Sequence, residues 1–356
     1  MPRIVFYKIG NTVFMDKSGG AQSGMKRKKI MRGSSYQMSD REEENAELPG
    51  GKSFIEPEQC SEETVSADRS SEEDVQTSLG ADALSDPADK AKRAKRLVIV
   101  VGASSGIGYE TALRLIGRGF AVSNISRTPC RLDQVKNYTA DVAEEGALEK
   151  AIAEAAAQTE NLYALVYCAG FSMAAPIEYA EEKDYRYLFD VNYFGAIRAI
   201  KGAVPLMKKR GGRIVVVSSM GGLFPIAFDS FYSSSKAAVD MLVKSAAIEL
   251  EPYNIRVSAV RPGGTSTGFT FKRKIYGDEA NGEYAPNVKR AAAVLADMEQ
   301  EGMSAGEVAK SVADVVCEKN PPLLLQCGGW NKFYAVAKRV LPDKAAQYIS
   351  KKVYKQ

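Results

Sequence analysis

The feature of this chain that most constrains its fold is a short apolar run, Leu97–Val101, which is followed at once by a glycine-rich turn. Consecutive β-forming residues without polar alternation predict a strand that is buried on both faces, as in the interior of a parallel sheet. The turn reads Gly102-Ala-Ser-Ser-Gly106-Ile-Gly108, and an amphipathic stretch follows it. Glycines allow a phosphate to approach the backbone, and a helix amino terminus attracts the negative charge. We therefore expect a nucleotide diphosphate here, with an ordinary strand–helix turn as the alternative.

The rest of the chain alternates between strand and helix patterns. Predicted strands cover residues 120–126, 135–138, 162–168, 213–218, 255–260 and 323–326. Predicted helices cover residues 144–158, 181–209, 231–251 and 306–318. This alternation predicts βαβ units and a single Rossmann-like, doubly wound parallel sheet between two helical layers, which is a three-layer α/β domain over residues 93–330.

The two ends of the chain differ from this central domain. Residues 1–92 precede it and, beyond residue 17, are rich in Ser, Glu, Asp, Gly and Lys. We expect a disordered extension there, with a regulatory tail as the functional alternative. Residues 331–356 hold seven Lys or Arg and one acid. This segment is expected to be a basic amphipathic helical tail that docks on the domain, folds over the substrate cleft or touches a membrane surface.

Composition excludes several classes of chemistry. The 356 residues include no histidine, which removes mechanisms that use imidazole as a base or as a metal ligand. The five cysteines are scattered and lack CxxC spacing, so we expect no disulfide framework, no metal site and a cytoplasmic location. The net charge of +4 is dispersed, which argues against a nucleic-acid partner. We also expect no export signal and no membrane-spanning helix.

The residues after the second predicted strand bear on the choice of cofactor. Ser126 and Arg127 stand where an acidic residue would bind the ribose 2′-hydroxyl of NAD, and a cation there accommodates a 2′-phosphate instead. This favours NADP(H) over NAD(H), with a plain surface arginine as the alternative. Asp141 and Val142 follow the third strand, where they would meet the adenine, although Asp141 could instead initiate a helix.

Tyr232 and Lys236 form a second chemical signal, in the sequence Tyr-Ser-Ser-Ser-Lys. Side chains four residues apart on a helix share a face. A nearby ammonium favours phenolate over phenol and lowers a tyrosine pKa from its usual value of ~10. The pair is therefore a candidate proton donor and acceptor that needs no histidine. Ser219 lies 13 residues upstream of Tyr232, and Asn192 lies 27 residues before Ser219.

Together these motifs resemble the short-chain dehydrogenase/reductase family, over about residues 96–326. The matching motifs are Gly106-Ile107-Gly108, Ala169-Gly170, Asn192, Ser219, Tyr232-x3-Lys236 and Arg261-Pro262-Gly263. Two positions depart from the family pattern: Val101 stands where the family usually has Thr, and Tyr167-Cys168 stands where it usually has Asn-Asn. Cys168 ends an apolar strand, so we expect a packed thiol rather than a reactive one.

The resemblance implies a catalytic tetrad of Asn192, Ser219, Tyr232 and Lys236. In the reducing direction, Tyr232 would protonate a carbonyl oxygen as a hydride arrives from the nicotinamide, and Ser219 would stabilise the developing charge. Lys236 would hold the nicotinamide ribose, and Asn192 would anchor a water. The residues implied in cofactor binding are Gly102, Ser104, Ser105, Gly106, Ile107, Gly108, Ser126, Arg127, Asp141, Val142, Cys168, Ala169, Gly170, Tyr232, Lys236, Pro262, Gly263 and Thr265.

The substrate must be inferred from the residues expected around Tyr232. These are apolar and include a predicted lid over residues 265–276; they are Phe171, Met173, Met220, Phe224, Ile226, Phe228, Phe231, Phe269, Phe271 and Tyr276. An apolar cleft favours a lipophilic ketone or alcohol of the steroid, retinoid or sphingoid kind, although part of this set could fill the core or a subunit contact. The alternatives are a 3-oxoacyl-thioester reductase and a catalytically silent nucleotide-binding regulator. The resemblance also implies a homodimer or homotetramer, formed through the helices around Tyr193 and Met241.

Overall fold

The computed structural model describes residues 4–9, 12–17, 96–157, 159, 161–277 and 279–354. The chain divides into two units, Met1–Ala67 and Asp68–Gln356. In the first unit, strands β1 (Ile4–Ile9) and β2 (Thr12–Lys17) pair in an antiparallel hairpin that the sequence analysis did not predict. The rest of the expected disordered extension lies outside the described residues.

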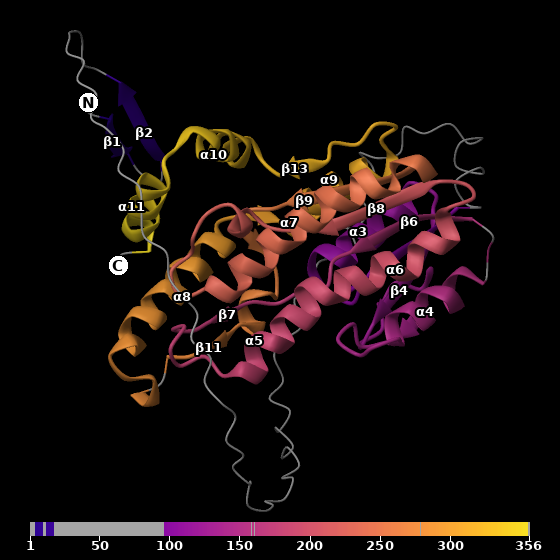
Figure 1. The fold of residues 1–356 in the computed structure, drawn as a ribbon, viewed down its shortest axis with the longest axis horizontal. Coiled ribbons are helices and arrows are strands. Elements are labelled where there is room, and N and C mark those ends of the chain that lie inside the picture. Colours follow the sequence, from indigo (N-terminus) through magenta and orange to yellow (C-terminus); the bar gives the residue numbers. More distant parts are fainter. Residues whose placement is uncertain are drawn as a thin grey trace, which may run out of the picture. The chain divides into compact units, whose positions relative to one another are not determined.

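The second unit is built on a seven-stranded sheet whose strands are all parallel (Figure 1). Its order is β13-β9-β8-β6-β3-β4-β5. The strands are β3 (Leu97–Val101), β4 (Ala121–Ser126), β5 (Val135–Thr139), β6 (Leu162–Tyr167), β8 (Gly212–Val217), β9 (Ile255–Arg261) and β13 (Leu324–Gln326). The order reverses between β3 and β6, which creates a crevice at the carboxyl ends of the strands. The predicted doubly wound parallel sheet is confirmed.

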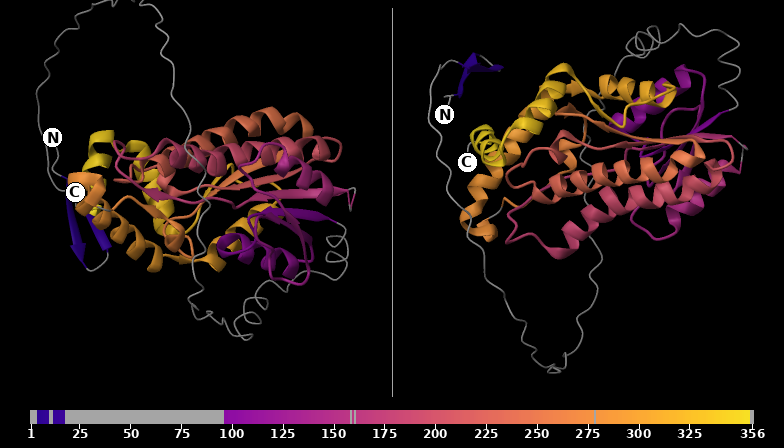
Figure 2. Two further views of the ribbon diagram at one scale, coloured as in Figure 1. Left: turned by 90° about the horizontal axis from the view of Figure 1, so that it is seen from below. Right: turned by 45° about the horizontal axis from the view of Figure 1, so that its top comes forward.

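Helices cover both faces of this sheet, and Figure 2 shows the resulting layers. One face packs against α4 (Ala147–Ala156), α6 (Gly195–Met207) and α7 (Ser230–Leu250), through a core that includes Ile99, Leu165 and Val243. The other face packs against α3 (Gly106–Gly117) and α9 (Ala305–Cys317). All five residues of β3 are buried, as the apolar run requires.

The long helical region predicted over residues 181–209 consists of three parts. Helix α5 (Glu182–Phe189) leads into a π-helical turn, η1 (Asp190–Phe194), and then into α6. The hydroxyl of Tyr167, on β6, donates a hydrogen bond to the carbonyl of Val191 at 2.5 Å within this turn. A Cβ atom on Gly195 would lie 2.2 Å from the Tyr167 hydroxyl oxygen, so the close approach of strand and helix requires glycine there. Such π-turns are frequent at functional sites, and this one contains Asn192.

The segments beyond β6 and β9 form a cap near the carboxyl ends of the strands. The longest of them is helix α8 (Ala285–Gln300), which the sequence analysis did not predict. Strand β7 (Met173–Ala174) pairs with β11 (Lys274–Ile275), and β10 (Thr265–Ser266) pairs with β12 (Met303–Ser304). Short 3₁₀ turns lie in several connections: η2 (Met220–Gly222) follows β8, η3 (Glu251–Tyr253) joins α7 to β9, and η4 (Thr270–Lys272) and η5 (Glu279–Tyr284) lie between β10 and α8.

The carboxyl-terminal tail is helical, as expected, and consists of α10 (Gly329–Val340) and α11 (Asp343–Val353). Ala346 is 2% exposed and Tyr354, just after α11, is 6% exposed, so the end of the tail docks against protein. Other apolar side chains of the tail, such as Phe333 and Tyr348, are exposed. Among the described residues, no helix combines the length and the apolar character needed to cross a membrane.

Candidate active site

The glycine turn between β3 and α3 has the geometry of a phosphate cradle. Gly102 adopts a φ of 90°, and a Cβ atom on Gly108 would lie 2.1 Å from the carbonyl oxygen of Gly102. No other residue fits at these positions without displacing the backbone. Ser105 stands at the N-cap of α3, and its side chain makes no capping hydrogen bond. The first backbone N–H groups of α3 are therefore available to an anion. Ser104 directly precedes the N-cap, and Ile107 lies in the first turn of the helix.

The crevice between β3 and β6 continues from this cradle. A Cβ atom on Gly102 would lie 3.0 Å from the backbone nitrogen of Ala169, which shows how closely the two strand ends approach. A Cβ atom on Gly170 would lie 3.1 Å from Asn192 Oδ1 and 3.3 Å from Lys236 Nζ. The glycine thus keeps open a gap in front of two polar side chains. This gap and the glycine cradle fit the two ends of a dinucleotide.

The opposite wall of the crevice follows β9. The carbonyl of Pro262 accepts a hydrogen bond from the Met220 amide at 2.8 Å, and the Thr265 hydroxyl donates to the carbonyl of Gly263 at 3.0 Å. Arg261, at the end of β9, forms a buried ion pair with Asp240 of α7 at 2.8 Å. This ion pair fixes the wall of the crevice to the helix that carries the catalytic candidates.

The residues expected near the adenosine lie together at the ends of β4 and β5. Arg127 is exposed, and its guanidinium donates a hydrogen bond to the Tyr187 hydroxyl at 2.8 Å. It also lies 3.6 Å from a carboxylate oxygen of Asp141. Ser126 donates to the carbonyl of Thr128 at 2.5 Å, and the carbonyl of Val142 accepts a hydrogen bond from Arg198. Neither Ser126 nor Arg127 is acidic, and the guanidinium of Arg127 is 68% exposed although it contacts Asp141 and Tyr187.

Ser219 and Tyr232 meet at the carboxyl end of β8. Ser219 caps the short turn η2, where its Oγ accepts a hydrogen bond from the Gly221 amide at 3.0 Å. Tyr232 lies in the first turn of α7, and its phenol is hydrogen-bonded to Ser219. A Cβ atom on Gly221 would lie 3.3 Å from both Ser219 Oγ and Tyr232 Cε1. The two hydroxyl groups are therefore placed to share one carbonyl oxygen.

Lys236 approaches the same place from one helical turn further along α7. Its side chain is buried, and its Nζ donates a hydrogen bond to the carbonyl of Val217 at 3.0 Å. The Nζ atom lies 5.7 Å from the centroid of the Tyr232 ring. Burial lowers the pKa of Lys236 to about 8, although the negative charge of Asp240 opposes this.

Asn192 is held rigidly in the π-turn. Its Oδ1 accepts a hydrogen bond from the Phe171 amide at 3.0 Å, and its Nδ2 donates to the Phe171 carbonyl at 2.9 Å and to Ser235 Oγ at 3.0 Å. Ser235 in turn donates to the carbonyl of Tyr232 at 2.7 Å. The structure therefore brings all four predicted tetrad residues together, and it links Asn192 to the backbone of the tyrosine.

One electrostatic expectation is wrong. Burial raises the pKa of the Tyr232 phenol above its ordinary value and outweighs the hydrogen bond to Ser219, which lowers it. Lys236 is not among the groups that lower this pKa; its Nζ bonds to the carbonyl of Val217 and lies 5.7 Å from the centroid of the ring. The phenol is therefore protonated at neutral pH, which is the state that a proton donor needs.

The apolar residues expected around Tyr232 divide into two groups. Phe269 packs edge-on against the Tyr232 ring, with 5.8 Å between the centroids, and Phe231 and Met173 belong to the same apolar cluster as Tyr232. Tyr276 is buried in this cluster, and its hydroxyl donates a hydrogen bond to the carboxylate of Asp184. Phe271, in contrast, is 86% exposed, so the predicted lid over residues 265–276 is only partly an apolar wall.

The structure favours a packed thiol at Cys168. Its amide donates to the carbonyl of Val101 at 2.9 Å, in register with β3 and β6. Burial raises the pKa of its thiol to about 12, so thiolate is scarce at neutral pH.

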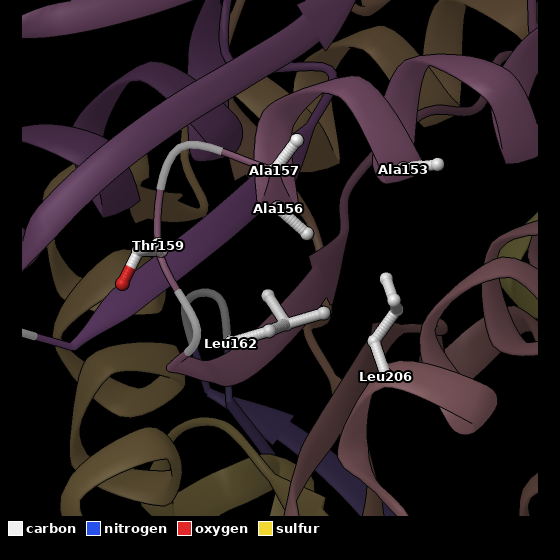
Figure 3. A pocket seen from close by; sticks show the side chains of 6 residues that line it. All are labelled: Ala153, Ala156, Ala157, Thr159, Leu162 and Leu206. Carbon is white, nitrogen blue, oxygen red and sulfur yellow. The ribbon is translucent and has the colours of Figure 1, made fainter.

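A shallow pocket of about 380 Å³ lies away from these residues, at the amino end of β6 (Figure 3). Its lining consists only of Ala153, Ala156, Ala157, Thr159, Leu162 and Leu206. It contains no titratable or nucleophilic side chain apart from one hydroxyl, and it lies at the amino end of β6, whereas the glycine cradle follows the carboxyl end of β3. We therefore assign it no catalytic role.

Sequence reasoning missed several residues that shape the site. Asn124, buried in β4, accepts a hydrogen bond from the Ala103 amide at 2.9 Å and so braces the glycine turn. Tyr167 braces the π-turn, as described above. Asp229, Arg273 and Glu299 come from three distant segments and lie close enough to Tyr232 for their charges to act on its phenol. An Asn inside an apolar strand was a usable signal, whereas the convergence of distant charges was not visible in the sequence.

Comparison with known proteins gives one consistent result. The sequence model of the family described as short chain dehydrogenase matches residues 96–275. The chain is 31% identical over 265 residues to a 3-ketodihydrosphingosine reductase of Bacteroides thetaiotaomicron, an alignment that covers 73% of this chain and 98% of that protein. It is 30% identical over 263 residues to retinol dehydrogenase 8 of Bos taurus, covering 65% and 80%.

A similar result comes from solved structures. The structure of ElxO with NADP bound superposes with a TM-score of 0.56 at 25% identity, covering 67% of this chain and 99% of that one. A short-chain dehydrogenase from Streptomyces avermitilis superposes with a TM-score of 0.60 at 25% identity, covering 69% of this chain and 93% of that one.

Proposed function

Because the chain belongs to the short-chain dehydrogenase family, whose enzymes act as oxidoreductases on CH–OH groups, we propose that it interconverts a lipophilic ketone and its secondary alcohol with NADP(H). The observation that carries this proposal is the convergence of Ser219, Tyr232 and Lys236 beside the gap at Gly170. Residues that are each weak evidence on their own thereby form one site.

Each side chain of the site has a separate role in the proposed reaction. The bound dinucleotide supplies or accepts a hydride. Tyr232, with its raised pKa, holds the proton that the carbonyl oxygen receives, and Ser219 donates a hydrogen bond to that oxygen as negative charge develops. Lys236 offers its ammonium to the gap at Gly170, and Asn192 fixes the backbone of the helix through Ser235. The relay of protons from Lys236 to solvent runs through hydroxyls and water, because the chain has no imidazole.

A preference for NADP(H) over NAD(H) is part of the proposal. It rests on Arg127, an exposed cation at the end of β4, and on the lack of a carboxylate at Ser126 and Arg127. The Asp141 carboxylate and the Tyr187 hydroxyl hold this guanidinium beside the crevice. A 2′-phosphate, which carries two negative charges, would compete with Asp141 and Tyr187 for the N–H donors of the Arg127 guanidinium.

A lipophilic substrate is supported by the cleft and by the relatives. Phe269 packs on the ring of Tyr232, and Phe231 and Met173 belong to the same apolar cluster, so apolar side chains border the tyrosine. The two relatives named above are called a 3-ketodihydrosphingosine reductase and a retinol dehydrogenase, and both of these substrates are lipophilic. We therefore favour a long-chain ketone over a sugar or a small acid.

Association with other molecules remains a prediction. Met241 and Ile248, seven residues apart on α7, are 59% and 76% exposed, which supports association of two copies through this face. Contact of the basic tail with a membrane surface and a cytoplasmic location also stay predictions.

The test is NADPH oxidation by the purified protein with a panel of long-chain, steroid and retinoid ketones, comparing the parent with Tyr232→Phe. Loss of the proton donor is expected to lower kcat by about 10²- to 10⁴-fold while NADPH binding, measured by fluorescence, is retained. Equal turnover by the two proteins would contradict the role of Tyr232. Failure of every ketone with the parent would contradict the proposed function.

A further inference from the structure

Residues 267–272, in the connection between β10 and α8, lie against the glycine cradle. A Cβ atom on Gly106, at the start of α3, would lie 3.6 Å from the Cβ atom of Thr267. The Nζ atom of Lys272 lies 3.5 Å from Oγ of Ser105, the N-cap of α3, although the two residues are 167 positions apart in the chain. Two side chains of one connection therefore approach the turn that is expected to hold the phosphates of a dinucleotide.

The ammonium of Lys272 has no ionic partner within the described part of the chain. This side chain is exposed, and its 3.5 Å separation from the Ser105 hydroxyl is longer than a typical hydrogen bond. Lys274, two residues further on, is in contrast paired with the carboxylate of Asp184. A weak contact with a neutral hydroxyl is readily replaced by an anionic oxygen, which forms a stronger, charge-assisted hydrogen bond.

Buried contacts on either side of Lys272 hold this connection in place. The hydroxyl of Thr270 and the guanidinium of Arg273 both bind the carboxylate of Glu299, on α8. Arg273 also donates from Nε to Ser172 Oγ at 2.8 Å, and its side chain is 2% exposed. Because the backbone is already positioned, the binding of an anion by Lys272 costs mainly the rotamer entropy of one side chain.

The same connection also reaches the catalytic tyrosine. Phe269 packs edge-on against the ring of Tyr232, with 5.8 Å between the centroids, and its amide donates a hydrogen bond to the Thr267 hydroxyl at 3.2 Å. Thr267 in turn lies beside Gly106 of the cradle. Residues 267–272 thus connect the phosphate cradle with the reacting phenol. An anion bound by this connection at the cradle would therefore stabilise the position of Phe269 at the tyrosine.

We propose that Lys272 is a further dinucleotide-binding residue, whose ammonium binds the pyrophosphate at the glycine cradle and thereby orders residues 267–272 beside Tyr232. This inference rests on the proposed dinucleotide-dependent function and adds a residue that the sequence motifs do not indicate. The N–H groups at the start of α3 offer partial positive charge to the pyrophosphate, and Lys272 adds a full one. The 2′-phosphate is assigned to Arg127 because that residue follows β4, whereas Ser105, which Lys272 contacts, lies in the cradle itself.

The experiment measures the dissociation constants of NADPH and NADH by fluorescence titration for the parent, Lys272→Gln and the control Lys289→Gln. Lys289 is exposed on α8, and its side chain lies beside Gly277 rather than at the cradle. Both dinucleotides carry the pyrophosphate, so we expect Lys272→Gln to weaken both by at least about threefold and more than Lys289→Gln does. A smaller loss, or an equal loss in Lys289→Gln, overturns the proposal. A loss confined to NADPH also overturns it, because the ammonium would then bind the 2′-phosphate.

Two further measurements test the charge and the ordering. Lys272→Arg is expected to bind both dinucleotides as the parent does, and the difference between the parent and Lys272→Gln is expected to shrink as NaCl rises from about 0.05 M to about 0.5 M. Saturating NADPH is expected to slow amide hydrogen exchange over residues 265–276 more in the parent than in Lys272→Gln. Equal protection in the two saturated proteins contradicts the ordering.

These outcomes separate the inference from the function on which it rests. Failure of the parent to bind either dinucleotide contradicts the proposed function. Binding by Lys272→Gln with the affinity of the parent contradicts only the role of Lys272.

Discussion

Lys236 donates a hydrogen bond from its Nζ to the backbone carbonyl of Val217 at 3.0 Å, and this buried Nζ lies 5.7 Å from the centroid of the Tyr232 ring. A single neutral acceptor compensates poorly for the hydration that an ammonium loses on burial. Burial therefore lowers the pKa of this lysine from 10.5 to about 8. The free-energy cost of burying the Lys236 ammonium is therefore measurable as a pH dependence of the free energy of unfolding.

We predict that the Lys236→Met variant loses a pH dependence of stability that the parent shows between pH 8 and 10.5. In this window the unfolded chain holds the lysine proton and the folded chain has released it, so Lys236 contributes a stability that rises with pH. Below pH 8 both states are protonated and the penalty, of about 3 kcal/mol at most, is fully present. Urea unfolding of the cofactor-free protein at several pH values measures the slope. Lys201→Met, on the exposed face of α6, is expected to keep the parental slope; an unchanged slope in Lys236→Met would refute the prediction.

A methyl group at Gly108 is predicted to abolish dinucleotide binding. The added Cβ would lie 2.1 Å from the carbonyl oxygen of Gly102, so either the turn opens or α3 moves away from the phosphate cradle. NADPH binding by the Gly108→Ala protein is measured by fluorescence titration, together with the melting temperature. Gly329→Ala is the control, because a Cβ atom there meets nothing within 4 Å. Binding within threefold of the parent in Gly108→Ala would show that the phosphates lie elsewhere.

Arg127→Ala is predicted to weaken the binding of NADPH by at least tenfold and that of NADH by no more than about twofold. The reason is that only NADPH carries the 2′-phosphate, for which the guanidinium supplies charge-assisted hydrogen bonds of about 1.5–3 kcal/mol. Dissociation constants of both dinucleotides are measured for the variant and the parent. Arg256→Ala, an exposed arginine near the amino end of β9, is the control for a general loss of positive charge. Equal losses for the two dinucleotides would remove the basis for an NADP(H) preference.

The sequence predicted the layers of the fold because its strands are strongly marked. An unbroken apolar run such as Leu97–Val101 has few alternatives to a central parallel strand, and its burial is complete. Helix α8 was missed although its buried residues follow a helical spacing, and they pack beside β7 and β10; the buried residues are Ala285, Val288, Ala291, Ala292 and Leu295. Gly195 within residues 181–209 allows a local break, but the π-turn before it was not predictable, because it is fixed by a tertiary contact, that of Tyr167 with Val191.

The candidate site, too, could be predicted from the sequence only in part. Tyr232 and Lys236 were predictable because four-residue spacing on a helix dictates a common face. The direction of the tyrosine pKa was not predictable, because it depends on burial and on the charges of Asp229 and Glu299, which approach from separate segments. Spacing along the chain determines which side chains share a face, whereas desolvation is a property of the assembled fold.

Tyr167→Phe is predicted to lower kcat by about three- to tenfold while dinucleotide binding is retained. The hydroxyl of Tyr167 satisfies the carbonyl of Val191, one residue before Asn192, so its removal leaves a buried acceptor unpaired and loosens the π-turn. The cost in stability is expected to be about 1–3 kcal/mol. The Asn192 amide would then hold Ser235, and through it the backbone of Tyr232, less firmly.

Tyr163→Phe is a closely matched control for this prediction. Tyr163 is on the same strand, β6, and its hydroxyl also donates to a backbone carbonyl, that of Val316 at 3.3 Å, but this contact is with α9 and away from Asn192. Stability measured by urea unfolding is expected to fall in both variants, whereas kcat should fall only in Tyr167→Phe. If both variants turn over at the parental rate, the π-turn tolerates the loss and Tyr167 contributes to the core alone. If kcat falls equally in both, the effect follows general stability and the link from Tyr167 to Asn192 is wrong.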